Sequence, residues 1–141
     1  MCIRDRTIAA YIFCYTADGP DDLTHGERLL RAHMAYYVGG MGKFYFDNVS
    51  RAGFNIEAKA IKKSWESGDR EQAARDVSDR MLESIVVLGD AQQCRDQIRA
   101  FRKEGVDLPI INFPHGTNLS TINRTITALA PKVNNSTQAP V

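Results

Sequence analysis

Residues 85–114, IVVLGDAQQCRDQIRAFRKEGVDLPIINFP, decide the fold of this chain. Two short apolar runs flank a longer segment in which apolar residues recur at helical spacing. Asp90 and Gln93 form a capping box at the start of that segment, and Gly105 can take the left-handed conformation that ends a helix. The sequence therefore predicts a strand, a helix and a strand that together form one unit of a parallel sheet.

The second apolar run, residues 108–113, follows the helix after a very short connection, as is typical of α/β proteins. Its apolar residues are consecutive, which predicts burial on both faces of the sheet. The first run, residues 85–88, is ambiguous, because a short apolar run is typical both of a strand and of the last turn of a helix. We predict a brief strand there.

Composition and charge exclude several classes of protein. The chain has 141 residues, of which 43% are hydrophobic and 25% charged, so it can bury one core. Its net charge of +1 and the lack of a basic tract argue against nucleic-acid binding. Cys2, Cys14 and Cys94 lack the spacing of a zinc site, and no run of about 18 apolar residues is present to span a membrane. We expect a cytoplasmic protein that binds neither metal, membrane nor nucleic acid.

The sequence before residue 85 predicts one long strand followed by several helices. Residues 7–16 are rich in β-branched and aromatic residues and end at the turn Asp18-Gly19-Pro20. Asp21 or Asp22 can cap the helix that follows. The predicted buried positions of the helices are Leu30, Met34, Tyr37, Val38, Met41, Ile56, Ala60, Ile61, Trp65, Ala74, Val77, Met81 and Ile85. The final helix is predicted to bury Leu119, Ile122, Ile126 and Leu129.

This order of elements is that of the end of an α/β barrel or of a doubly wound sheet. A complete eight-stranded barrel needs about 250 residues, so about three strands cannot close one. Residues 1–6, MCIRDR, resemble a short peptide that arises at the start of metagenomic gene models when sequencing-adapter bases are translated. We therefore expect an adapter-derived leader at 1–6, a barrel portion at 7–131 and a polar tail at 132–141.

Five phrases of the chain occur in the order in which one enzyme superfamily carries them. They are Ala9-Ala10-Tyr11-Ile12 with Ala35-Tyr36-Tyr37, WESGD at 65–69 with Ala73-Ala74, VSDRM at 77–81, GDAQQC at 89–94 and AFRKEGVD at 100–107. Through these phrases the chain resembles, from Thr7 to Pro131, the luciferase-like monooxygenase superfamily of bacterial luciferase and methylenetetrahydromethanopterin reductase. The resemblance implies an α/β fold that is the C-terminal part of a (β/α)8 TIM barrel, helix-rich, with about three strands and therefore incomplete.

The resemblance also implies an activity. It points to an oxidoreductase, either a monooxygenase or a hydride-transfer reductase, that acts on a small organic substrate with FMN or a deazaflavin coenzyme. Relatives usually carry Thr or Ser and then Pro where this chain has Asp90-Ala91, and the reductases tend towards small residues at 112–116, so the substrate stays open. We expect the parent protein to be a homo-oligomeric enzyme. The 141 residues alone are expected to be inactive, because most coenzyme and substrate contacts in the family come from earlier strands.

In such a barrel the active site lies at the C-terminal ends of the strands. The loops that follow the three predicted strands are therefore the parts of this chain that can line it. They give as site candidates Tyr15, Asp18, Gly89, Asp90, His115, Gly116 and Thr117. The residues predicted to bind the cofactor are Gly89, Asp90, His115, Gly116 and Thr117. We assign no catalytic residue and no metal ligand.

Each of these candidates also has a structural interpretation. His115 can hydrogen-bond a cofactor carbonyl or exchange a proton, or it can be an ordinary residue of a surface loop. Gly116 and Thr117 can present N–H groups to an anion at a helix N-terminus, or they can belong to an ordinary cap. Asp90 is first a helix cap and only secondarily a ligand contact.

The aromatic residues and histidines of the helices favour structural roles. Trp65, Tyr36 and Tyr37 lie on helical stripes, which favours core packing over stacking on a flavin. His25 and His33 have no third ligand nearby, so metal binding has no support. The alternative to an enzyme is a non-catalytic α/β module that uses the helices within 22–41 and 55–84 as an interaction or self-association surface.

Overall fold

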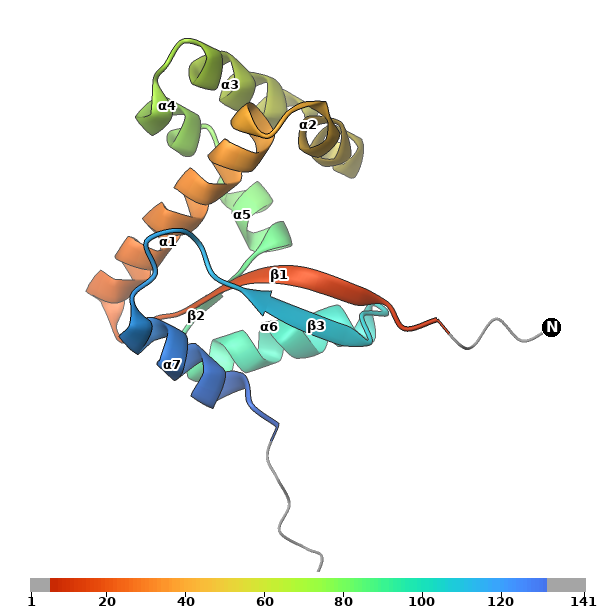
Figure 1. Ribbon diagram of the computed structural model, residues 1–141, viewed down its shortest axis with the longest axis vertical. Coiled ribbons are helices and arrows are strands. Elements are labelled where there is room, and N and C mark those ends of the chain that lie inside the picture. Colours follow the sequence, from red (N-terminus) through yellow and green to blue (C-terminus); the bar gives the residue numbers. More distant parts are fainter. Residues whose placement is uncertain (1–5, 132–141) are drawn as a thin grey trace, which may run out of the picture.

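Three parallel strands lie at the centre of the computed structural model, which describes residues 6–131 (Figure 1). The strands are β1 (Ala9–Thr16), β2 (Val87–Gly89) and β3 (Leu108–Asn112). The helices are α1 (Pro20–Ala35), α2 (Lys43–Val49), α3 (Asn55–Glu66), α4 (Arg70–Arg75), α5 (Asp79–Ile85), α6 (Ala91–Lys103) and α7 (Leu119–Leu129), with π-helical turns η1 (Tyr36–Gly40) and η2 (Ser50–Phe54). The predictions for residues 1–5 of the leader and for the tail at 132–141 lie outside the described residues.

β1 is the central strand, and β2 and β3 pair with it in parallel on opposite edges. β2 pairs with the end of β1, where Thr16 lies opposite Gly89. β3 pairs with the earlier part of β1, up to Asn112 opposite Phe13. This helix-rich α/β fold with an open three-stranded parallel sheet confirms the predicted fold class, with three strands and no closed barrel among the described residues. The sequence did not predict that β1 would separate the two strands of the unit at 85–114.

The ambiguous run at 85–88 contains both a helix end and the start of a strand. α5 ends at Ile85, the next residue has extended backbone angles, and β2 begins at Val87. Ser78 caps α5, because its side chain accepts a hydrogen bond from the N–H of Met81. The brief strand is confirmed, with its start two residues later than predicted.

The two faces of the sheet are covered to different extents. Alternate side chains of β1 point to opposite faces. Ile12 and Cys14 pack against Cys94 on the side covered by α6 and α7, whereas Tyr15 enters a larger core with α1 on the other side (Figure 1). The expected burial of residues 108–113 on both faces is wrong, because Leu108 is exposed and the rest of β3 is only half-buried. β3 is an edge strand with no further strand beside it among the described residues.

α1 begins differently from the prediction. Gly19 is the N-cap residue, and Pro20 occupies the first helical position, where the missing N–H has no intrahelical partner to lose. Neither Asp21 nor Asp22 caps the helix. The Gly-Pro turn therefore sets the start of α1, and the carboxylate of Asp22 is free to contact other elements.

α7 buries two threonines and only part of the predicted apolar face. Ile122 and Leu129 are half-buried, and Leu129 packs against the core around Cys94. Thr121 and Thr125 are buried, whereas Leu119 and Ile126 are largely exposed. The hydroxyl of Thr125 accepts a hydrogen bond from the N–H of Thr16 at 3.3 Å and donates one to the carbonyl of Thr121 at 2.9 Å. The prediction that Leu119 and Ile126 point inward is wrong, because these contacts to β1 fix the rotation of the helix.

Two other positions on the predicted buried stripes are exposed. Met41 follows η1, and a π-helical turn holds more residues than an α-helical one, so the 3.6-residue spacing of α1 does not continue through it. Ile56 lies in the first turn of α3, just after Gly53 interrupts the helical backbone with a φ of 97°. Both deviations come from irregular backbone that apolar spacing does not reveal.

Candidate functional site

The C-terminal ends of the strands bring the predicted site residues towards one side of the sheet, called here its C-terminal edge. Thr16 of β1 lies opposite Gly89 of β2, which places the turn after β1 beside Asp90. β3 ends opposite Phe13, and the loop at 114–117 runs from there towards α1. The predicted residues that follow β1 and β2 are thus brought together, and those that follow β3 reach the same side by way of α1.

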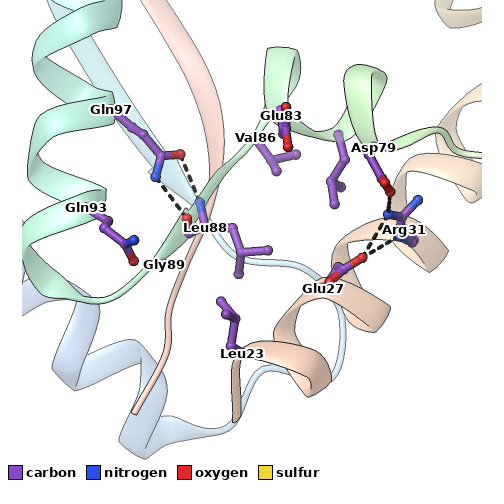
Figure 2. Close-up of a pocket in the computed structure, with 11 residues that line it drawn as sticks. Leu23, Glu27, Arg31, Asp79, Glu83, Val86, Leu88, Gly89, Gln93 and Gln97 are labelled. Carbon is purple, nitrogen blue, oxygen red and sulfur yellow. Dashed lines mark hydrogen bonds and ion pairs between the residues drawn. The ribbon is translucent and has the colours of Figure 1, made fainter. Parts of the chain in front are cut away.

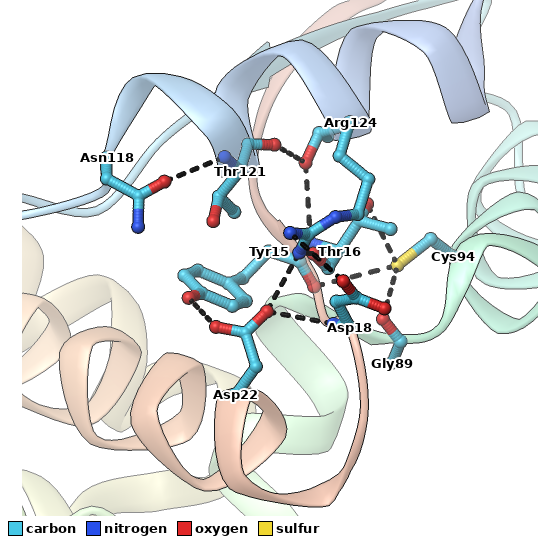
Figure 3. Close-up of polar contacts among 10 residues, drawn as sticks. Tyr15, Thr16, Asp18, Asp22, Gly89, Cys94, Asn118, Thr121 and Arg124 are labelled. Carbon is cyan, nitrogen blue, oxygen red and sulfur yellow. Dashed lines mark hydrogen bonds and ion pairs between the residues drawn. The ribbon is translucent and has the colours of Figure 1, made fainter.

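A polar cluster ties this edge to α1 and α7 (Figure 3). Asp22 of α1 is its centre. Its carboxylate accepts hydrogen bonds from the Tyr15 phenol at 2.6 Å and from the Asp18 N–H at 2.8 Å. The Arg124 guanidinium of α7 donates to Asp22 at 2.8 Å and to the Thr16 carbonyl at 3.0 Å. One side chain of α1 therefore joins the end of β1 to α7.

The charges of this cluster are fixed at neutral pH. Burial raises the pKa of Asp22, but hydrogen bonds from Tyr15, the Asp18 N–H and Arg124 outweigh it and hold the pKa below its usual range. Burial and the hydrogen bond to Asp22 raise the pKa of the Tyr15 phenol. The carboxylate of Asp18 lies 3.7 Å from Arg124 and is exposed to solvent. Asp22 and Arg124 thus position the edge, and Asp18 is the charged member that a ligand can reach.

A groove of about 570 Å³ opens at the end of β2, between α1, α5 and α6 (Figure 2). Arg31 lies in its wall and pairs with Glu27 at 2.8 Å and also with Asp79. The side-chain amide of Gln97 accepts from the Leu88 N–H at 3.2 Å and donates to the Leu88 carbonyl at 2.8 Å. The polar groups of the groove therefore mostly bind one another, and Gln97 occupies the outer edge of β2. The rest of the lining is apolar and comes from Leu23, Leu82, Val86 and Leu88.

Asp90 caps α6 as the sequence predicted. Its carboxylate accepts hydrogen bonds from the N–H groups of Gln92 and Gln93, each at 2.8 Å, and the Gln93 side chain accepts from the Asp90 N–H at 2.9 Å. A Cβ atom on Gly89 would lie only 2.6 Å from the Gln93 side-chain oxygen. The capping box therefore also requires glycine at the end of β2.

Replacing Asp90 with alanine should lower the free energy of unfolding by about 1 kcal/mol, because two N–H groups of α6 lose their acceptor. Asp90→Ser should keep most of the stability, since serine is also a good cap. Urea denaturation measures both, with Asp96→Ala in the middle of α6 as the surface control. Equal stability of Asp90→Ala and the wild type would show that the cap contributes nothing.

His115 and Gly116 lie against α1. The N–H of His115 donates to Nδ1 of His33 at 3.3 Å, and the two imidazole rings are 5.4 Å apart. Gly116 has a φ of 87°, and a Cβ atom there would lie 3.3 Å from the Leu29 side chain. A side chain at position 116 would therefore be strained as well as crowded.

The hydrogen bonds of Thr117 and Asn118 are made to residues close to them in the sequence. Both the N–H and the hydroxyl of Thr117 donate to the Pro114 carbonyl, at 3.2 Å and 2.7 Å. Asn118 is the N-cap of α7, and its side chain accepts from the Thr121 N–H at 2.8 Å. Thr117 therefore folds the loop, and the cap of α7 is the next residue.

Sequence reasoning missed three residues that hold this edge together. Asp22 appeared only as a candidate cap, Arg124 was not considered, and His33 was treated as an isolated histidine. Their partners are distant in sequence, since Asp22 and Arg124 are 102 positions apart and His33 and His115 are 82 apart. No local spacing could have found them.

The remaining predictions concern aromatic packing, metals and membranes. Trp65 packs against the backbone of Gly39, where a Cβ atom would lie 2.6 Å from it, and Arg70 stacks 3.7 Å from its ring centroid. Tyr36 is partly exposed beside Trp65, with ring centroids 5.8 Å apart.

Within residues 6–131 there is no group of three or more side chains arranged to hold a metal ion. No helix of that same part of the chain is both long and apolar enough to cross a membrane.

Part of this chain is similar to known proteins. A sequence model of the family described as luciferase-like monooxygenase matches residues 3–108. A candidate coenzyme F420-dependent oxidoreductase of Mycobacterium tuberculosis, Rv3520c, is 27% identical over 95 residues. The match covers 64% of this chain but only 27% of that protein, so the chain corresponds to a small part of the relative's length. No solved structure matches the chain.

Proposed function

Because this chain belongs to the luciferase-like monooxygenase family, we propose that residues 7–131 are the C-terminal portion of a (β/α)8-barrel oxidoreductase. The reaction we assign is hydride transfer between a deazaflavin coenzyme and a small organic substrate. The name of the similar M. tuberculosis protein supports the deazaflavin, and FMN is the alternative. The observation that carries the proposal is the convergence of the strand ends and their loops on one edge, where barrel enzymes bind their ligands.

A hollow of about 450 Å³ beside the end of β3 fits a planar ring system. Phe13, Tyr37 and Tyr45 line it, and Tyr37 meets the other two rings edge to face with centroids 5.7 Å and 4.8 Å away. Asn112, the last residue of β3, contributes a side-chain amide. Aromatic faces and one amide are the groups that a flat, partly polar ring needs for binding and orientation.

When bound, the deazaflavin would supply the hydride chemistry. The chain's own groups would prepare the site for it. The aromatic rings exclude water from one side of the hollow, and the Asn112 amide orients a polar ring edge. His115, in the next loop, can hydrogen-bond a cofactor carbonyl. Gly89, Asp90, Gly116 and Thr117 complete the proposed rim at the strand ends.

The open face of the sheet supports the assignment to a larger barrel. Tyr11 is 73% exposed, whereas Phe13 on the same face is half-buried and Tyr15 is fully buried. The outer edge of β3 meets no further strand within the described residues. In a closed barrel, additional strands cover such a face and pair with such an edge. We infer that earlier barrel strands do both here.

Extended upstream to the length of a whole barrel, the protein should bind coenzyme F420 more tightly than FMN. His115→Ala should weaken F420 binding about tenfold, the loss of roughly one hydrogen bond. His25→Ala, a histidine on α1 that lies outside the proposed rim, is the matched control and should bind normally. Fluorescence titration of each protein with each coenzyme measures these affinities. Failure to bind either coenzyme would overturn the enzyme assignment.

Exposed apolar residues on the outer helices favour a second candidate function. Phe44 of α2 is 67% exposed, and Ile56 of α3 is 82% exposed. Such residues suit a self-association surface, either in a homo-oligomeric enzyme or in a non-catalytic module. Sedimentation of the barrel-length protein and of Ile56→Lys separates the cases. If the barrel-length protein is an oligomer that binds coenzyme and Ile56→Lys dissociates it, the protein is an oligomeric enzyme. If the oligomer binds no coenzyme, the protein is the non-catalytic module.

A further inference from the structure

The loop between β3 and α7 is fastened to α1 at one hydrogen bond. The backbone N–H of His115 donates to Nδ1 of His33 at 3.3 Å. The same loop contacts α1 again where Gly116 approaches Leu29, but that contact is apolar and has no direction. The hydrogen bond to His33 is therefore the directional contact that fixes the position of His115 relative to α1.

The hydrogen bond defines the protonation state of His33. An imidazole nitrogen that accepts a hydrogen bond carries no proton, so the neutral ring must carry its proton on Nε2. His33 is only 8% exposed, and its Nε2 is buried without a hydrogen-bond partner among residues 6–131. The ring is instead enclosed by Phe13 at 4.5 Å and Tyr37 at 4.9 Å between centroids. The site thus accommodates the neutral imidazole.

We propose that His33 is a positioning residue whose neutral imidazole latches the loop at 114–117, and that protonation of His33 releases the loop. Protonation would turn Nδ1 from an acceptor into a donor that faces the donor N–H of His115. It would also bury a positive charge between two aromatic rings. The latch is independent of the proposed function.

The surroundings of His33 contain little that would stabilise its charge. The facing groups are the neutral Phe13 ring from β1, the Tyr37 phenol from η1 and the titratable His115 imidazole from the loop. Burial lowers the pKa of His33, and the charge of a protonated His115 lowers it further. A histidine whose pKa is lowered by folding stabilises the fold less as the pH falls below about 6.5, because the unfolded chain then binds the proton more readily.

Amide hydrogen exchange and NMR of the 141-residue chain test the latch. Between pH 8 and pH 5 the His115 amide should lose about tenfold in protection relative to its intrinsic exchange rate, while amides of β1 keep theirs. The imidazole nitrogen shifts of His33 should show the Nε2-protonated tautomer at pH 8. An unprotected His115 amide at pH 8, or the opposite tautomer, would overturn the proposal.

Two variants separate His33 from other titrating groups. His33→Asn places an uncharged oxygen acceptor near the position of Nδ1, so protection of the His115 amide should persist and lose its dependence on pH. His115→Gln keeps the backbone N–H and removes the second imidazole, so the pH dependence should remain. Unchanged pH dependence in His33→Asn, or its loss in His115→Gln, would assign the effect to His115 and contradict the latch.

Discussion

Replacing Gly26 with alanine should lower the free energy of unfolding by about 2–3 kcal/mol. On helix propensity alone the substitution should stabilise α1 by up to about 1 kcal/mol. Packing reverses the sign, because a Cβ atom at position 26 would lie 2.3 Å from the ring of Tyr15. Tyr15 is completely buried and its phenol is bonded to Asp22 at 2.6 Å, so the ring cannot move aside. Thermal and urea denaturation measure the loss.

A double-mutant cycle provides the control. Tyr15→Val removes the ring that a Cβ atom at position 26 would strike, so adding Gly26→Ala to that variant should cost nothing or stabilise it slightly. Arg28→Ala, on the exposed side of the same helix, should change stability by less than about 0.5 kcal/mol. A destabilising Gly26→Ala that is equally harmful in the Tyr15→Val background would mean that the contact with Tyr15 is not the cause.

Asp22→Ala should cost about 2–3 kcal/mol, since it leaves the Tyr15 phenol without its acceptor and removes the carboxylate nearest to the Arg124 guanidinium. Asp21 is the ideal control, because it lies in the same first turn of α1 and experiences the same helix dipole. Asp21→Ala should therefore reproduce the dipole contribution alone, about 0.5 kcal/mol. Chemical denaturation of the two variants isolates the hydrogen bonds of Asp22.

The cost of Asp22→Ala should also depend on pH in a defined direction. The pKa of Asp22 is lowered in the folded protein, so its contribution is fully present above the unfolded pKa of about 4. It is lost as the pH falls from there through the lower folded pKa. The stability difference between wild type and Asp22→Ala should therefore be constant from pH 8 to pH 5 and shrink below pH 4. A difference that persists undiminished at low pH would show that the lost contact is not with the carboxylate.

The elements that the sequence predicted well are those whose determinants lie within a few residues of one another. The capping box of Asp90 and Gln93 is present as predicted, and the helix that it starts ends just before Gly105. Even for the ambiguous run at 85–88, the predicted strand is present and only its start is wrong, because α5 and β2 follow each other with one residue between them. The family resemblance rests on these same local phrases, and the family match confirms it.

The candidate site was predicted only in outline. The end-of-strand rule predicted that Asp18 and Asp90 lie near each other, and the pairing of Thr16 with Gly89 brings the turns that carry them together. Their binding roles remain predictions. It could not find Arg124 or His33, because a polar residue on a helix gives no periodic signal of its partner. It also could not show that Thr117 uses its N–H within the loop.

By itself, the sequence determined the three strands, the capped start of α6 and the family, because caps, turns and apolar spacing act between near neighbours in the chain. The tertiary structure decided which face of α7 is buried, which strand is central and what Asp22 binds. These depend on contacts between residues about 100 positions apart, such as Thr16 with Thr125 and Asp22 with Arg124. Buried polar groups must find partners across such distances, and that requirement outweighed the apolar pattern of α7.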